Sequence, residues 1–296
     1  MQMMTGFLIL DKPEGITSFT AARIVRRVTG EKKAGHTGTL DPMATGVLPV
    51  ALGHATRFIE LLPSHDKGYR ASFRLGETTD TLDITGKTLT VCDAVPDESA
   101  VIASFESFRG NIEQLPPMYS AIQKDGKRLY ELARQGIEVE REKRNVTIYN
   151  LTYISHNENE YVIDVKCSKG TYIRSLISDI GEYLGCGAVM TSLRRTLSNG
   201  FPIEEAHTEE QLKNADDPSV FLIPVDKALD AYPALTVSDA QARRFSNGGE
   251  LDAKRIHRKL TDSLYRMYSP SGAFLGLGEY TENDMAIKVK RVYVND

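Results

Sequence analysis

The sequence has no tryptophan, only three cysteines and no apolar run near the roughly 20 residues that span a bilayer. The cysteines are widely spaced without a C-x-x-C pair, which excludes the usual signature of a disulfide framework or zinc site. The six histidines are equally scattered, so we expect no metal. The apolar stretch at the N-terminus is too short for a signal peptide, and a cytoplasmic protein is expected.

Motifs for binding nucleotide phosphates are also missing. Neither G-x-x-x-x-G-K-[ST] nor G-x-G-x-x-G occurs, so the sequence gives no sign of a nucleotide or redox cofactor. The net charge of −4 argues weakly against a nucleic-acid partner, but the charge is segregated. Basic residues gather in 23–33, 124–144 and 243–259, and acidic ones in 204–217. A local positive face on an acidic protein is therefore expected, although any one cluster could equally be a solvated helix face.

A loop near the start of the chain presents one carboxylate, Asp41, among glycine, proline and threonine. Glycines at 35, 38 and 46 allow backbone conformations barred to other residues, and Pro42 keeps Asp41 out of helical geometry. A charge on a specially shaped loop indicates function. The alternative is an ordinary turn aspartate that accepts a hydrogen bond from a nearby backbone N–H.

The remaining pattern predicts an α+β fold of 296 residues. Alternating or short apolar runs predict strands over 7–10, 47–52, 69–75, 146–154 and 161–167. Helical spacing predicts helices from Thr17 or Ser18 to Gly30, over 55–62, 97–108 and 173–184. Residues 77–86 read as a polar loop, and 114–144 as a partly mobile excursion rich in charge.

An acidic stretch and two prolines suggest a domain boundary near residue 232. Short β segments over 264–268, 273–278 and 286–294 follow it. We expect a mixed, mainly antiparallel sheet over 1–232, with an insertion at 114–144, and a small β-rich module over 233–296. No internal repeat is present.

Three further side chains could join Asp41 in a site. Tyr69 lies in a predicted strand, Arg174 begins a predicted helix after Lys169–Tyr172, and His36 stands five residues before Asp41. A nucleophilic carboxylate, a guanidinium that keeps it ionised and a flat ring that stacks on a base suit chemistry on a nucleoside.

At these residues the chain resembles the bacterial tRNA pseudouridine-55 synthase family (TruB), from Phe7 to about Pro202. Several long motifs occur in the family's order, which makes the resemblance specific. They are D-K-P-E-G at 11–15, A-G-H-T-G-T-L-D-P-M-A-T-G-V-L-P at 34–49, D-K-G-Y-R at 66–70, L-G-E-T-T-D-T-L-D at 75–83, P-P-M-Y-S-A at 116–121, C-S-K-G-T-Y-I-R-S at 167–175 and L-R-R at 193–195.

The resemblance implies a pseudouridine synthase fold and conversion of uridine 55 in the tRNA T-loop to pseudouridine. Asp41 would be the catalytic aspartate that attacks the flipped uridine, and Arg174 its partner. Tyr69 would stack on the base and is the candidate for proton transfer. Whether the attack falls on the ribose or the base, or whether the reaction proceeds by elimination, stays open.

The resemblance also assigns binding roles. His36 would wedge into the T-loop, Tyr172 and the backbone around Leu193 would line the uracil pocket, and Lys12 would lie near the same cleft. Residues 114–144 match the family's RNA-gripping insertion. The C-terminal module resembles a PUA domain that contacts the acceptor stem, a weaker match based on F-L-G-L-G-E at 274–279. No cofactor or protein partner is implied, and a monomer is expected.

The sequence is also compatible with other functions. The chain could be a tRNA-binding or tRNA-folding module with secondary catalysis, or a guide-RNA-dependent, dyskerin-like synthase, which the 114–144 insertion disfavours. Tyr172 and Tyr69 could be core aromatics, and His36 could bond only its own loop. For Asp80 and Asp83, which lack the ligand spacing of a calcium loop, we expect stabilisation of their own loop.

Overall fold

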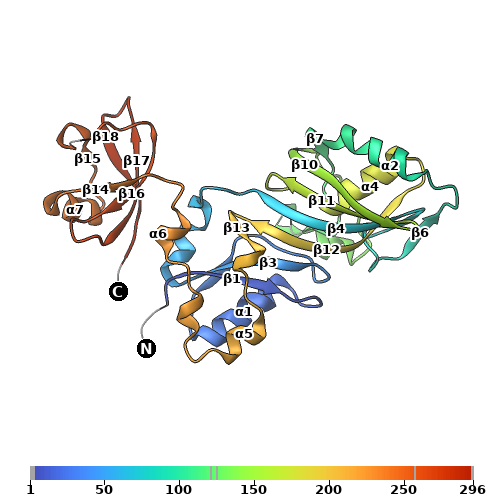
Figure 1. Ribbon diagram of the computed structural model, residues 1–296, viewed down its shortest axis with the longest axis horizontal. Helices are drawn as coiled ribbons and strands as arrows, with labels where there is room; N and C mark the ends of the chain where they lie inside the picture. Colours follow the sequence, from blue (N-terminus) through green and yellow to red (C-terminus); the bar gives the residue numbers. More distant parts are fainter. Residues whose placement is uncertain (1–3, 121, 125, 257, 295–296) are drawn as a thin grey trace.

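The computed structural model describes residues 4–120, 122–124, 126–256 and 258–294. Two sheets organise this part of the chain, one of nine strands and one of five. The five-stranded sheet lies at one end of the molecule, and the segment around α6 leads into it (Figure 1). The expected mixed, mainly antiparallel α+β fold with a small β-rich C-terminal unit is confirmed.

The large sheet has the order β1-β3-β12-β4-β11-β10-β7, with β2 paired to β3 and β13 to β12. Its pairs are antiparallel except for β3 and β12, which run parallel through two residue pairs. The strands are β1 (Gly6–Lys12), β2 (Ala34–His36), β3 (Thr45–Leu52), β4 (Lys67–Leu75), β7 (Gly110–Gln114), β10 (Arg144–Asn157), β11 (Glu160–Cys167), β12 (Ala188–Ser198) and β13 (Phe201–Pro202).

A glycine allows β3 and β12 to meet beside the Asp41 loop. Gly46 has a φ of +98°, and a Cβ at this position would lie 2.2 Å from the carbonyl oxygen of Arg195. A side chain is therefore excluded by both backbone conformation and space. This close contact holds the end of the Asp41 loop against the strand that carries Leu193 and Arg195.

Helices cover the large sheet in two places. α1 (Ser18–Thr29) has Thr17 as its N-cap and Gly30 at φ 68° as its C-cap, so Thr17 is the capping residue of the two candidates. α1 packs on β1 and β3, whereas α4 (Ile173–Tyr183) packs on β4, β11 and β12. α2 (Glu98–Ser104) begins at Asp97 as expected and continues as η2 (Phe105–Phe108).

The short helix expected over 55–62 is present as a 3-10 helix, η1 (Gly53–Leu61). One expectation about local structure is wrong. The expected polar loop at 77–86 contains β5 (Glu77–Thr79), which forms a two-stranded sheet with β6 (Thr88–Val91). Threonine-rich polar strands lack the apolar alternation that reveals a half-buried strand, so the sequence pattern hid this hairpin.

The 114–144 segment contains short elements in its described part. They are β8 (Gln123–Lys124), β9 (Lys127–Arg128) and α3 (Leu129–Ala133). Leu129 and Leu132 of α3 are buried. Ala121 and Asp125, which the expected insertion also includes, lie outside the described residues.

The segment that follows β13 carries only short helices. These are η3 (Ile203–Glu205), α5 (Glu209–Asn214), η4 (Pro218–Phe221) and α6 (Val225–Ala228). The C-terminal sheet comprises β14 (Ala234–Thr236), β15 (Leu251–Asp252), β16 (Ser263–Tyr268), β17 (Phe274–Thr281) and β18 (Ala286–Val292), in the order β14-β16-β17-β18-β15. α7 (Asp239–Ser246) and η5 (Ala253–Arg255) complete it.

An aromatic contact joins the two sheets. The ring of Phe274 on β17 lies 6.3 Å from that of Phe58 on η1, and both belong to one buried cluster with Phe7 of β1. The C-terminal unit is therefore packed against the large sheet. In the described part of the chain, no helix is both long and apolar enough to cross a membrane.

Candidate active site

Hydrogen bonds from the β1–α1 segment shape the loop that carries Asp41. The Ser18 hydroxyl accepts from the Leu40 N–H at 2.8 Å and donates to the Leu40 carbonyl at 3.1 Å. The Gly15 N–H donates to the Pro42 carbonyl at 2.8 Å, and the Ala44 N–H to the Asp41 carbonyl at 3.1 Å. The backbone on both sides of Asp41 is thus fixed, which defines where the carboxylate lies.

Lys12 at the end of β1 also stabilises the loop that carries Asp41. Its side chain is fully buried, and its ammonium donates to the carbonyls of Pro13 at 2.9 Å, Pro42 at 3.2 Å and Ala44 at 2.6 Å. Burial lowers the pKa of Lys12 to about 8, although the nearby Asp41 carboxylate favours its charged form. Lys12 therefore organises the loop rather than facing an open cleft.

Asp41 and Asp83 hold Arg174 between them. The Arg174 Nη2 lies 3.0 Å from Asp41 Oδ2, and its Nη1 lies 3.5 Å from Asp83 Oδ2. The Arg174 side chain is 5% exposed, whereas that of Asp41 is 34% exposed. The expected pairing of Asp41 with Arg174 is confirmed. The carboxylate is open to a ligand, and the guanidinium is covered.

The protonation of Asp41 reflects opposing influences. Burial raises its pKa, and the Asp83 charge raises it further. The Arg174 guanidinium and the Lys12 ammonium lower it. Arg174 is thus the main group that favours the ionised carboxylate in a partly buried site.

The hairpin loop after β5 fixes Asp83. Its Oδ1 accepts from the hydroxyls of Thr81 at 2.8 Å and Thr85 at 2.5 Å, and from the Thr85 N–H at 3.0 Å. Arg174 also donates to the Thr81 carbonyl at 3.0 Å and the Tyr119 carbonyl at 2.7 Å. Asp83 therefore stabilises its own loop, as expected, but also orients Arg174, which the sequence did not indicate.

Tyr69, Leu193 and Arg195 face the same side of the large sheet. Tyr69 on β4 lies opposite Arg195 on β12, and Leu193 on β12 lies opposite Ala71. Tyr69 and Leu193 are 9% and 7% exposed and share a buried cluster with Leu40 and Ala44 of the Asp41 loop. Burial raises the pKa of Tyr69, whereas the adjacent Arg195 lowers it. Tyr69 and Leu193 are thus placed beside the loop that carries Asp41.

Tyr172 stands at the start of α4, directly before the helix that carries Arg174. Gln114 clamps its backbone: the Tyr172 N–H donates to Gln114 Oε1 at 2.8 Å, and Gln114 Nε2 donates to the Tyr172 carbonyl at 3.0 Å. Burial raises the pKa of Tyr172. The start of the 114–144 segment therefore positions the end of α4 that carries the site.

His36 ends β2, which pairs with β3. Its Nδ1 is buried without a hydrogen-bond partner among the described residues, as is the hydroxyl of Thr37. Burial and the Arg195 charge lower the pKa of His36. The alternative that His36 merely bonds its own loop thus has no support at Nδ1.

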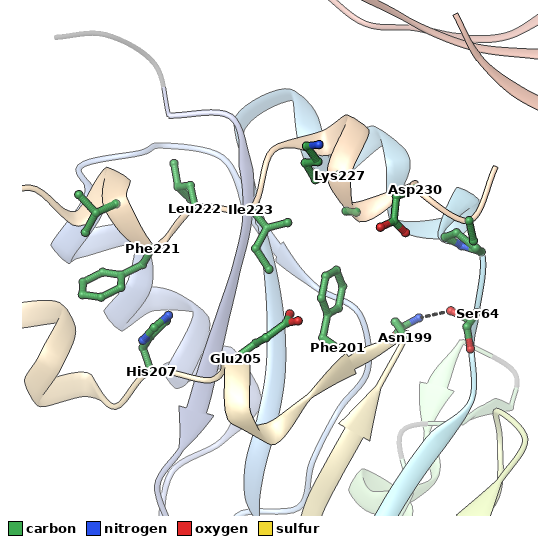
Figure 2. A pocket seen from close by; sticks show the side chains of 15 residues that line it. Ser64, Asn199, Phe201, Glu205, His207, Phe221, Leu222, Ile223, Lys227 and Asp230 are labelled. Carbon is green, nitrogen blue, oxygen red and sulfur yellow. Dashed lines mark hydrogen bonds between the residues drawn. The ribbon is translucent and has the colours of Figure 1, made fainter. Parts of the chain in front are cut away.

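A separate cavity of about 510 Å³ opens between the β12–β13 turn and residues 220–231, and none of the seven predicted site residues lines it. Figure 2 shows Phe201, Ile223 and Glu205 on its wall and the hydrogen bond from Asn199 to Ser64 at one side. Within the ranges that the structure describes, no group of three or more His, Cys, Asp or Glu side chains could hold a metal ion.

The structure brings Asp41, Arg174 and Lys12 into one network and places Tyr69, Leu193, Tyr172 and His36 around it. Sequence reasoning missed Arg195, Gln114 and the contact of Asp83 with Arg174. Arg195 and Asp83 lie within the family motifs at 193–195 and 75–83, which was the one indication of a role that the sequence offered. Gln114 has only its position before Pro116 and Pro117 to distinguish it.

Three family models match consecutive parts of the chain. They are the TruB family pseudouridylate synthase N-terminal domain over 26–173, the tRNA pseudouridylate synthase B C-terminal domain over 174–230, and the pseudouridine synthase II TruB C-terminal model over 233–293. Together they cover nearly all of the chain from residue 26 onward.

Curated relatives match over almost the whole length. The tRNA pseudouridine synthase B of Clostridium kluyveri is 42% identical over 292 residues, covering 98% of this chain and 100% of the relative. That of Chromohalobacter salexigens is 46% identical, covering 94% and 91%. That of Escherichia coli O1:K1 is 41% identical, covering 93% and 91%.

A solved structure shares the fold. It is described as an H/ACA RNP bound to a substrate RNA containing 2'-deoxyuridine. This chain is 26% identical to it, with a TM-score of 0.75, over 99% of this chain and 86% of that one. A Cbf5-Nop10-Gar1 complex gives 27% identity and a TM-score of 0.73, over 98% and 85%.

Proposed function

This chain belongs to the TruB family of pseudouridylate synthases and is an isomerase of uridine in tRNA; we propose that it modifies uridine 55 in the T-loop, with Asp41 as its nucleophile. The observation that carries the proposal is the Asp41–Arg174 pair at 3.0 Å, in which the carboxylate is partly exposed and the guanidinium is buried. A nucleophile needs access to substrate, and its partner needs a fixed place.

We assign an isomerisation of uridine to these residues. Asp41 attacks the flipped uridine and the glycosidic bond breaks. Uracil then turns and rejoins the sugar through carbon 5, and the bond to Asp41 breaks, which restores the free carboxylate. All atoms are conserved, since the proton lost from carbon 5 is balanced by the one gained at the released nitrogen. Tyr69 stacks on the base and is the group for proton transfer. Arg174 holds Asp41 ionised, and the Tyr172 side chain and the Leu193 backbone line the uracil pocket.

RNA binding is assigned to three parts of the chain. His36 enters the T-loop where the target nucleotide has left the stack. The 114–144 segment grips the T-arm, supported by the Gln114 clamp on Tyr172. The proposed module over 233–296 acts as a PUA-like domain on the acceptor stem, beside a catalytic domain over 1–232. A cytoplasmic monomer that needs no protein partner or cofactor fits an enzyme that handles free tRNA.

The test is Asp41→Asn, which keeps the shape of the side chain but removes its charge. The tRNA is incubated with enzyme, pseudouridine is mapped, and binding is measured in parallel. We expect the variant to bind tRNA and form no pseudouridine. Substantial turnover would end the assignment of Asp41, and modification at another uridine would end the assignment of position 55. Glu14→Gln, an exposed carboxylate on the preceding turn, is the matched control.

A second candidate, a guide-RNA-dependent synthase, follows from the likeness to the structure of an H/ACA RNP bound to a substrate RNA. Activity on a bare tRNA transcript without any added RNA separates the two. We expect full activity on the bare transcript, in line with the relatives that are 41–46% identical. A role in tRNA folding is compatible with either and would survive in Asp41→Asn.

A further inference from the structure

Two cations beside Tyr69, the half-buried Lys67 and the buried Arg195, have no assigned role. Lys67 begins β4, and Arg195 lies on β12 opposite Tyr69. Arg195 is 1% exposed, and its guanidinium donates to the carbonyls of Val47 at 2.7 Å and Gly38 at 3.1 Å. These partners are neutral, so they fix the guanidinium without balancing its charge.

Lys67 is held in the same way. Its ammonium donates to the Ser198 hydroxyl at 2.8 Å and to the side-chain oxygen of Asn199. The nitrogen of that amide donates to the Ser64 carbonyl at 3.2 Å, which sets the amide's orientation (Figure 2). The ammonium is thus directed by a preformed network of neutral groups.

Within the described ranges, neither cation forms an ion pair with a carboxylate. Burial and the Arg195 charge lower the pKa of Lys67 to about 7, against a smaller opposing effect of Cys167 and Asp66. The Lys67 charge in turn contributes to lowering the pKa of His65. A buried and a half-buried cation without an anion are costly to maintain, and an anionic ligand would reduce that cost for both.

Both cations point to one place next to Gly38. A Cβ on Gly38 would lie 3.7 Å from Arg195 Nη1 and 3.7 Å from Lys67 Nζ. The unpartnered hydroxyl of Thr37 belongs to the same loop, between His36 and Gly38. The space beside Gly38 is therefore lined by two cationic hydrogen-bond donors and adjoins His36, which is assigned to RNA binding.

We propose that Lys67 and Arg195 form an anion site that takes one phosphodiester group of the RNA next to the target nucleotide. The proposal rests on the proposed function, since the substrate supplies the phosphate. Because Arg195 lies opposite Tyr69 in the sheet, the site would fix the backbone of the nucleotide whose base stacks on Tyr69. A phosphodiester fits better than a nucleobase because it brings the negative charge that the two cations lack.

The experiment scans T-arm RNA with single methylphosphonate linkages, which are neutral, and measures binding to the Asp41→Asn protein. We expect one linkage near the target uridine to weaken binding by about tenfold or more, as for loss of a hydrogen bond to a charged group. In Lys67→Met that linkage should have little further effect. Lys67→Met should also lower the salt slope of binding by about 0.7, the value for one single-stranded phosphate.

Lys166→Met is the matched control, because Lys166 lies on the neighbouring strand β11 and is exposed. It should leave the effect of that linkage intact. Equal sensitivity to that linkage in wild type and Lys67→Met would overturn the proposal. Because these are binding measurements, they remain decisive if the enzyme modifies a different uridine, whereas failure of the proposed function appears only in the mapping of pseudouridine.

A second variant keeps both cations in place. Gly38→Ala puts a methyl group between them, whereas Gly35→Ala adds one that meets only Ile59 and Thr56 carbons at 3.5–4.0 Å. We expect Gly38→Ala to weaken binding of the unmodified RNA and Gly35→Ala to have little effect. Equal RNA binding by Gly38→Ala and Gly35→Ala would refute the location of the site. This comparison holds even if Lys67→Met does not fold.

The protonation of Lys67 supplies a third readout. Since the pKa of Lys67 is about 7 in the free protein and a phosphate would raise it, RNA binding should weaken as pH rises above 7. Arginine stays charged throughout this range, so Lys67→Arg should flatten the dependence. A pH dependence unchanged in Lys67→Arg would contradict the proposal. His65, Asp66, Cys167 and Arg195 are the charged or titratable groups near Lys67 and are the same in both proteins.

Discussion

Substitution of Asp83 by asparagine tests whether the second carboxylate on Arg174 contributes to the reaction. Asparagine has the same shape, and its side-chain oxygen can still accept from Thr81 and Thr85, as Asp83 Oδ1 does at 2.8 and 2.5 Å. The change is at Asp83 Oδ2, which lies 3.5 Å from Arg174 Nη1. In asparagine this position holds either an amide nitrogen or an uncharged oxygen. The perturbation thus affects Arg174 more than the loop.

The expected magnitude follows from that contact. A hydrogen bond to a charged group contributes about 1.5–3 kcal/mol, and at 3.5 Å we take the lower end of that range. If Arg174 loses this restraint and the fixed geometry of Asp41 is lost with it, the rate of the chemical step should fall by about tenfold or more. Binding of tRNA should be unchanged, because Asp83 is 4% exposed and so does not face the RNA.

The pH profile provides a second, independent sign. Asp83 raises the pKa of Asp41, so removing its charge should lower that pKa. Activity that depends on ionised Asp41 is lost as pH falls through this pKa. The acid limb of the single-turnover rate should therefore move to lower pH in Asp83→Asn, even though the maximal rate is smaller. A variant that merely unfolds would not shift this limb downward.

The assay is single-turnover pseudouridine formation with enzyme in excess over tRNA, measured across pH, with tRNA affinity determined separately. Asp80→Asn is the matched control, because Asp80 lies in the same hairpin but accepts from the Lys87 N–H and is exposed. It should retain the wild-type rate and profile. A wild-type rate in Asp83→Asn, or an acid limb that moves to higher pH, would refute the reasoning.

Three further predictions concern stability, each measured by denaturant unfolding. Gly46→Ala should lower the free energy of unfolding by about 3 kcal/mol or more, because its Cβ would lie 2.2 Å from the Arg195 carbonyl oxygen. Gly200→Ala, the control, should cost only about 1 kcal/mol of backbone strain. Equal costs for the two variants would contradict the contact. The pKa of Lys12 is about 8 in the folded protein and 10.5 in the unfolded one, so the unfolded state binds more protons between these values. From pH 8 to 10, the free energy of unfolding of the wild type should therefore rise by about 1.4 kcal/mol per pH unit relative to Lys12→Met. Parallel plots of stability against pH would count against the burial of Lys12. Phe274→Ala should cost about 3–4 kcal/mol because it empties the contact with Phe58, and a loss below 1 kcal/mol would show that the sheets are not packed together.

Much of the local structure was predictable from the sequence. The helix at 18–29 could be predicted because Thr17 and Gly30 are the residue types that begin and end helices, and its apolar residues follow helical spacing. The strand at 67–75 was visible from its alternation of buried and basic residues. The hairpin of β5 and β6 was not, because its stability comes from threonine side chains and loop hydrogen bonds rather than from an apolar face.

For the candidate site, the residues could be named from motifs but their partners could not. Asp41 and Arg174 are 133 positions apart, and the sequence alone suggested the pair only because a catalytic carboxylate needs a cation. The pattern offered no reason to join Asp83 to Arg174, or Arg195 to Gly38 and Val47, because these contacts depend on the register of β12 against β4 and β3. Register is set by long-range pairing and by one glycine, Gly46.

The sequence by itself determined the chemistry-bearing residue types, the shape-giving glycines of the Asp41 loop and the family to which the chain belongs. Only the tertiary structure decided which charges are covered and which remain open. The same residue type, lysine, became a buried support at Lys12 and a cation beside Gly38 at Lys67. Burial is the physical reason: it depends on which strands meet in the folded chain, and it decides whether a charge stabilises a loop or attracts a ligand.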